Sequence, residues 1–124
     1  TSNTTNNNPA SWVDTASTIT MTPRSVMSAI EITADGELAQ VGGGITGQAR
    51  LQRGGSQIGA LATISTASGG TTWVRTHLRA LDFLGSTGAT TWTVQIAPQS
   101  GSSNTTWPTA GGSAGTMTAR ELAA

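Results

Sequence analysis

Three side chains that could do chemistry lie close together in one segment of the chain. Arg75, His77 and Arg79 alternate in the sequence, so a β-strand would project all three from one face. Two guanidinium groups at this spacing could hold a carboxylate, sulfate or phosphate, and the histidine could tune that binding with pH. The alternatives are a solvent-exposed strand face or a subunit interface. We favour the interface, with acids of an adjacent subunit such as Glu31 or Glu37 as partners.

Trp73 precedes this group in the same alternating phase. An exposed tryptophan beside arginine is a common anchor of protein interfaces. It could also serve as a stacking platform for a sugar ring. The candidate interface or ligand face therefore consists of Trp73, Arg75, His77 and Arg79.

The other reactive side chains do not form a recognisable catalytic or metal site. His77 and Asp82 could join a serine in a triad, but the chain has no Gly-x-Ser-x-Gly nucleophile turn. Glu31, Asp35 and Glu37 lack the repeated aspartates and the distal glutamate of a calcium-binding loop. We therefore expect no enzyme, no catalytic residues, no metal and no cofactor.

The composition describes a weakly charged surface. The 124 residues include no lysine, cysteine or tyrosine, the net charge is zero, and charged residues make up 10% of the chain, against about 25% in ordinary domains. A chain without net charge does not attract nucleic acid or an anionic membrane, and no stretch reaches the roughly 20 apolar residues of a membrane span. Such a surface suits a protein that covers itself by self-association or lives on a large particle.

Alternating segments separated by glycine, serine and proline predict an all-β fold. The expected strands cover residues 12–21, 28–34, 37–41, 45–52, 57–64, 71–83, 90–97 and 116–122. We expect a single jelly roll or β-sandwich of about seven to eight strands in residues 11–124. The residues expected in its core are Leu51, Ile58, Val74, Leu78, Trp92, Val94 and Ile96.

Four local features complete the expected fold. Residues 1–10 are polar and rich in asparagine, which predicts a flexible arm that orders only on another subunit or on a capsid. Residues 99–115 predict a long loop, and Asp35-Gly36 predicts a tight turn or a bulge in a longer strand. A bulge near Leu81 and Phe83 is expected to switch the phase of the 71–83 strand.

Several segments occur in an order that is known from one family. A strand ends at Thr22-Pro23, and a hairpin follows with the sequence Arg-Leu-Gln-Arg-Gly-Gly at 50–55 and Ile-Gly at 58–59. Asp82 then precedes the segment Ser-Thr-Gly-Ala-Thr-Thr-Trp at 86–92. The sequence Arg-Glu-Leu-Ala at 120–123 belongs to the last segment. This order resembles a small β-domain of tailed-bacteriophage virion proteins. The resemblance implies a jelly-roll-like module, commonly trimeric, that occurs in fibre tips and on capsid surfaces and has no catalytic residues.

These observations together predict a structural component on the exterior of a bacteriophage virion. The leading expectation is a capsid decoration, or cement, protein: a homotrimer that contacts the major capsid protein or another virion protein. The alternative is a trimeric tail-fibre, head-fibre or spike tip that binds a host-surface glycan, and a free carbohydrate-binding module is more distant. No shaft, coiled coil or collagen-like run precedes the domain, which favours decoration over a fibre.

Overall fold

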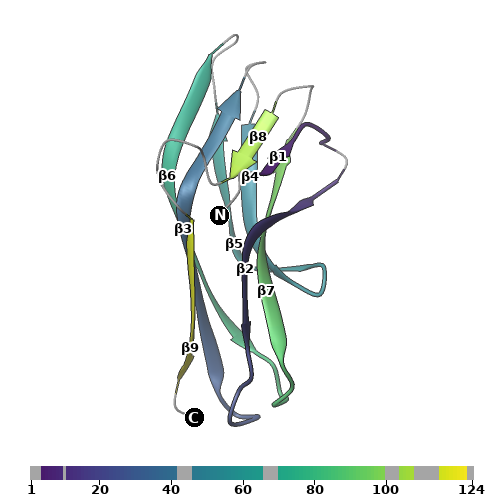
Figure 1. Ribbon diagram of the computed structural model, residues 1–124, viewed down its shortest axis with the longest axis vertical. Coiled ribbons are helices and arrows are strands. Elements are labelled where there is room, and N and C mark those ends of the chain that lie inside the picture. The colour runs from purple at the N-terminus through teal and green to yellow at the C-terminus, as the bar shows by residue number, and fades with distance from the viewer. Residues whose placement is uncertain are drawn as a thin grey trace.

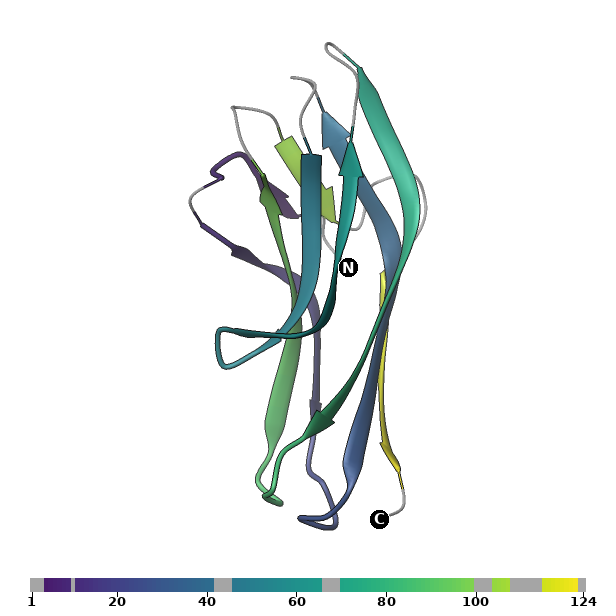
Figure 2. The ribbon, with the colours of Figure 1, turned by 180° about the vertical axis from the view of Figure 1, so that it is seen from behind.

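The protein folds as a β-sandwich of two antiparallel sheets (Figures 1 and 2). A computed structural model describes residues 4–9, 11–41, 46–65, 70–99, 104–107 and 115–122. The strands are β1 (Thr4–Asn6), β2 (Val13–Met21), β3 (Ala29–Val41), β4 (Thr46–Arg53), β5 (Ser56–Ser65), β6 (Thr71–Phe83), β7 (Thr90–Pro98), β8 (Asn104–Trp107) and β9 (Thr116–Leu122). These ranges contain no helix, and the prediction of a single all-β sandwich is confirmed.

The two sheets differ in size and share no strand. The four-stranded sheet has the order β2-β7-β4-β5, and the five-stranded sheet has the order β1-β8-β3-β6 with β9 as a further neighbour of β3. One edge of β3 pairs with β6 along its whole length, while the other edge pairs with β8 and β9 in turn. In Figure 1 the edge strands β9 and β2 face the viewer, and β5 and β6 lie behind.

The core lies between the sheets and follows the alternation in the sequence. Every second residue of β3 from Ile30 to Leu38 is buried, because the period-2 pattern turns these side chains toward the other sheet. The fully or almost fully buried core residues are Ile30, Ile32, Ala34, Leu38, Ala49, Leu51, Ile64, Leu78, Ala80, Trp92, Val94, Ile96 and Trp107.

The predicted core residues are buried with two exceptions. Ile58 is only partly buried and packs against the core. The prediction for Val74 is wrong, because its side chain is 41% exposed. Val74 keeps the inward phase and lies opposite the buried Leu38, but it belongs to β6, which has a hydrogen-bonded neighbour on one edge only.

The described residues form nine strands where seven to eight were expected: β1 and β8 were missed, and the expected strands 28–34 and 37–41 are one strand, β3. The predicted flexible arm is wrong for Thr4–Asn6, which pairs with β8 as β1, while residues 1–3 and 10 lie outside the described residues. Asn6 is buried and its Nδ2 donates to the backbone carbonyls of Ile96 at 2.9 Å and Ser11 at 2.8 Å. The polar segment β1 is thus held on the sandwich of its own chain by side-chain hydrogen bonds of Asn6, and not by apolar contacts.

The segment predicted as a loop at residues 99–115 contains β8, which carries a buried tryptophan. Trp107 is fully buried, and its indole Nε1 donates to Ser17 Oγ at 3.0 Å in the opposite sheet. Its ring packs on Gly36, where an added Cβ would lie 2.6 Å from the Cζ2 atom of the indole. Gly36 is therefore neither in a tight turn nor at a bulge: β3 pairs with β6 without interruption on both sides of it.

Threonine pairs take the place of many surface charges. Cross-strand hydroxyl contacts join Thr5 to Thr106, Thr18 to Thr93, Thr20 to Thr91, and Thr33 to Thr118. Such cross-strand pairs stabilise a sheet without ionised groups.

Candidate functional site

The outer face of the five-stranded sheet carries the four residues that the sequence singled out. Trp73, Arg75, His77 and Arg79 are all exposed on β6. Thr76, Leu78 and Ala80, which alternate with them, are buried. The side chains therefore project from one face of an edge strand, as expected from their alternation.

Acids of the neighbouring strand β3 neutralise this row within the same chain. His77 Nδ1 lies 2.6 Å from Asp35 Oδ1, and Arg79 contacts Glu31 through Nη2 at 2.6 Å and Nε at 2.9 Å. Arg75 lies directly opposite Glu37 in the strand register. We call these six residues of β3 and β6 the charged strip. Glu31 was proposed above as a partner from an adjacent subunit, and that assignment is wrong because its arginine partners lie in its own chain.

Glu31 is the most strongly held acid of the charged strip. The hydrogen bond from Arg79 is the largest influence and lowers the pKa of the Glu31 carboxyl; partial burial opposes it, and the charge of Arg120 on β9 adds to the lowering. Arg120 Nη2 donates to the second carboxylate oxygen at 2.9 Å. Both oxygens of Glu31 are therefore occupied by guanidinium groups, and Arg79 uses its Nε and Nη2 donors within its own chain.

Apolar side chains flank the charged strip on the same face. Trp73 is 60% exposed at one end, and Leu81 and Phe83 are 44% and 69% exposed at the other. The expected bulge near Leu81 and Phe83 is absent, because the β3–β6 register runs unbroken from Ala29 opposite Phe83 to Val41 opposite Thr71. The sequence signal was present: simple alternation from Trp73 through Phe83 places both residues on this outer face.

The structure separates the residues of the other constellations. His77 and Asp82 have opposite phases on β6, so Asp82 points inward, where it accepts hydrogen bonds from Arg53 at 2.5 Å and from Trp92 at 2.8 Å. Within the described part of the chain, no three histidine or acidic residues gather in a way that could hold a metal ion.

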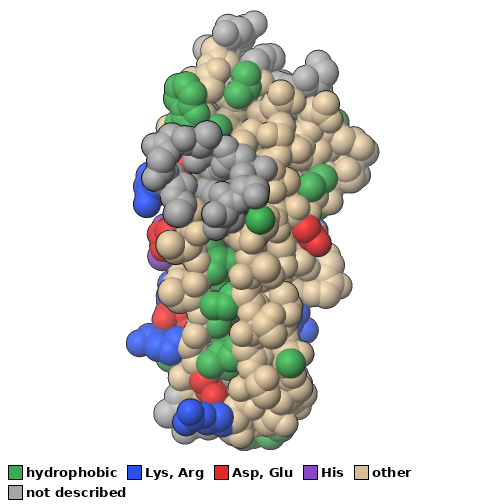
Figure 3. All heavy atoms as spheres, viewed as in Figure 1, with side chains coloured by type: hydrophobic (Ala, Val, Ile, Leu, Met, Phe, Trp, Pro, Cys, Tyr) green, Lys and Arg blue, Asp and Glu red, His purple; other side chains and the backbone are tan. Residues whose placement is uncertain are grey.

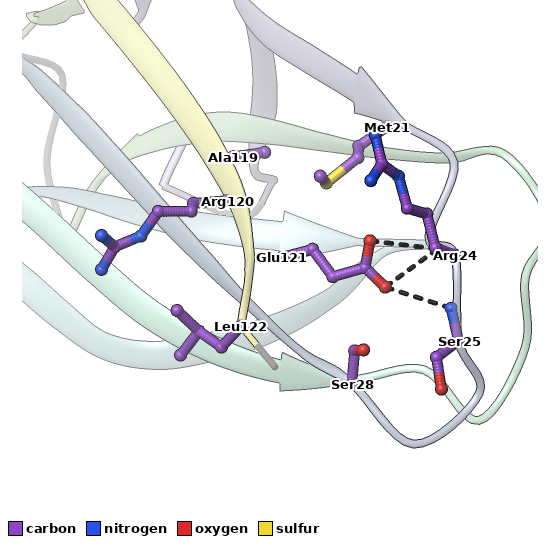
Figure 4. Close-up of a pocket in the computed structure, with 8 residues that line it drawn as sticks. All are labelled: Met21, Arg24, Ser25, Ser28, Ala119, Arg120, Glu121 and Leu122. Atoms are coloured by element: carbon purple, nitrogen blue, oxygen red, sulfur yellow. Dashed lines mark hydrogen bonds between the residues drawn. The ribbon is translucent and has the colours of Figure 1, made fainter. Parts of the chain in front are cut away.

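A pocket that the sequence did not indicate lies between β9 and the end of β2 (Figure 4). It has a volume of about 510 Å³ and is lined by Met21, Arg24, Ser25, Ser28, Ala119, Arg120, Glu121 and Leu122. We call it the β2/β9 pocket. The Glu121 carboxylate accepts from the backbone amides of Arg24 at 2.9 Å and Ser25 at 3.1 Å. No local pattern predicts this pocket, because its two walls come from distant parts of the sequence: Arg24 and Glu121, which are in contact, are 97 residues apart.

The Glu121 carboxylate is stabilised in its ionised form by this loop. Partial burial would raise the pKa of Glu121, but hydrogen bonds from Ser28 and from the two loop amides, together with the charge of Arg24, outweigh burial and lower it. The side chain thus fastens β9 to the β2–β3 loop at neutral pH.

Comparison with protein-family models, with curated proteins and with solved structures found no match for this chain. No helix in the described ranges is long and apolar enough to cross a membrane.

Proposed function

We propose that this chain is a non-enzymatic structural module that assembles with copies of itself on the exterior of a bacteriophage particle. The leading form is a capsid decoration protein, a homotrimer that binds the major capsid protein or another virion protein. The virion setting comes from the order of sequence segments, and the assembly role is supported by the outer face of the five-stranded sheet.

One observation carries the assembly role: large apolar side chains are exposed at both ends of the charged strip. Single exposed hydrophobic residues are normal on protein surfaces, whereas neighbouring ones that form a patch mark an interaction site. Leu81 and Phe83 are neighbours on the outer face of β6, and Trp73 lies on the same face beyond the charged strip. The acids and bases between them are largely paired within the chain, so a partner that covers this face leaves fewer uncompensated charges.

The first experiment measures the mass of the purified protein by size-exclusion chromatography with light scattering. We expect about three times the 12.5 kDa chain mass. The double substitution Trp73→Ser with Leu81→Ser should lower this mass, while Leu61→Ser, at an exposed apolar residue of the other sheet, should leave it unchanged. A wild-type monomer at micromolar concentration would contradict the assembly role.

The second experiment separates decoration from a fibre or spike tip. On a stained gel of purified particles, a decoration protein approaches the abundance of the major capsid protein, whereas a fibre or spike protein is far scarcer. The glycan-binding alternative has one supporting feature, the exposed Trp73 beside Arg75. The glycan-binding function is favoured over decoration if Trp73→Ala removes binding to host cells and leaves the oligomer intact.

A further inference from the structure

The β2/β9 pocket has the character of a receptor for an aromatic side chain. Met21 and Ala119 supply apolar side chains; Figure 4 shows the Arg24 side chain beside Met21 and the Leu122 side chain on the other side of β9. The charge of Arg24 acts on the Glu121 carboxylate of the same pocket, although Arg24 forms no ion pair among the described residues. A guanidinium group attracts the face of an aromatic ring. An apolar cavity of about 150 Å³ can hold benzene, so a pocket of about 510 Å³ has ample room for a phenyl ring.

The same chain exposes a phenyl ring, Phe83, at the same position along the strand direction as the pocket. Phe83 is the only phenylalanine of the protein and is 69% exposed. Ala29 of β3 lies opposite Phe83 on one side and opposite Leu122 on the other. Phe83 and the pocket-lining Leu122 therefore occupy one row across the sheet. A neighbouring copy related by rotation about an axis parallel to the strands could bring Phe83 to this pocket without a shift along the axis.

The pocket and the ring lie on neighbouring sides of the molecule. In Figure 3 the charged side chains of the outer sheet face gather mainly along the left edge, while a column of hydrophobic side chains follows the seam between the sheets at the front. Phe83 is exposed on the outer face of β6, and the pocket is lined by residues of β9 and of the chain that follows β2. Contacts between two different patches form a closed ring when the rotation between copies closes, and an open filament otherwise. A contact with no axial offset avoids the translation that produces a helical filament, and it gives a ring when the rotation between copies is a whole fraction of a turn.

We propose that Phe83 of one copy inserts into the β2/β9 pocket of the next copy, where it packs on Met21 and Ala119 beside the Arg24 guanidinium. This inference rests on the proposed function, because it names the contact through which the copies assemble. The contact is heterologous, so each copy both donates one phenyl ring and receives one.

Two substitutions remove opposite halves of this contact. Phe83→Ala deletes the ring and leaves the pocket, while Ser25→Trp fills the pocket from its rim and leaves the ring. We expect each to weaken self-association by about tenfold or more, the range of an aromatic interface anchor. Leu61→Ala, on β5, is the matched control and should assemble as the wild type does.

Fluorine NMR of protein labelled with 4-fluorophenylalanine reports directly on the ring, because Phe83 gives the only signal. In the wild type we expect the signal to move from a pocket position to a solvent position as dilution dissociates the oligomer. In the Ser25→Trp variant it should stay at the solvent position at every concentration. These results, together with a lower oligomer mass in both the Phe83→Ala and the Ser25→Trp variants, would support the contact.

Two other outcomes have different consequences. If the wild type is an oligomer but the Phe83 signal stays at the solvent position and Ser25→Trp assembles normally, the pocket contact is wrong and the assembly role stands. If the wild type is a monomer at all concentrations, the assembly role itself is wrong and the pocket contact is wrong with it.

Discussion

The indole Nε1 of Trp92 donates a hydrogen bond of 2.8 Å to the carboxylate of Asp82, across the interior between the two sheets. Asp82 lies on β6 in the five-stranded sheet, and Trp92 lies on β7 in the four-stranded sheet. Arg53 completes the group with donor contacts of 2.5 and 3.0 Å to the two oxygens of the same carboxylate. A buried acid thus ties the sheets together at the end that exposes Phe83.

Asp82→Asn should destabilise the fold at neutral pH by about 1–2 kcal/mol, because the buried carboxylate loses its charge-assisted hydrogen bonds while the Arg53 side chain, 40% exposed, is partly screened by water. Burial would raise the pKa of Asp82, but the hydrogen bonds from Arg53 and Trp92 and the charge of Arg53 hold it below its usual value. A lowered pKa in the folded state contributes stability that is complete above the unfolded pKa of about 3.9 and is lost as the pH falls through the folded value.

The difference in unfolding free energy between wild type and Asp82→Asn should therefore shrink as the pH falls below about 4. Urea unfolding at a series of pH values measures this difference. A difference that stays constant down to pH 2 would show that the Asp82 carboxylate contributes nothing through its charge.

Trp92→Ala should cost about 3–5 kcal/mol, since a large buried aromatic leaves a cavity that the neighbouring strands cannot close. Trp92 is fully buried in the core. Trp92→Phe keeps most of the volume and removes the donor to Asp82, so it should cost less than the alanine substitution. Chemical unfolding of both variants gives the comparison, and a cost below about 1 kcal/mol for alanine would be incompatible with the described packing.

Gly36→Ala should destabilise the protein by about 1–3 kcal/mol through overpacking. The new methyl group would lie 2.6 Å from the ring of Trp107, which is buried and cannot move freely. Gly88→Ala is the control, because a Cβ at that position would have no atom within 4 Å. Thermal unfolding should give a lower Tm for the first variant only; equal Tm values would mean that Trp107 does not pack on Gly36.

Asn6→Ala should cost about 1–2 kcal/mol, because a buried side chain loses two hydrogen bonds to backbone carbonyls. Asn7→Ala, at the exposed neighbouring position, should be neutral. The unfolding free energies of both variants distinguish β1 from a flexible arm: an arm that orders only on a partner would make both substitutions neutral in the isolated protein.

The sequence by itself determined the fold class and most of the core. Period-2 alternation depends on local geometry alone, so it placed Leu51, Leu78, Trp92 and Ile96 inside without knowledge of any partner strand. The Gly54-Gly55 turn was equally local, because both residues need the positive φ that glycine adopts readily.

Only the tertiary structure decided which strands are neighbours, and the site depends on that choice. Arg79 meets Glu31 of its own chain because β3 and β6 pair in a fixed register over a separation of 48 residues, which no local pattern encodes. The β2/β9 pocket likewise exists only where two sheet edges approach. Asn6 and Trp107 were missed for the same reason: short polar segments become strands when a distant partner satisfies their hydrogen bonds or covers one large side chain.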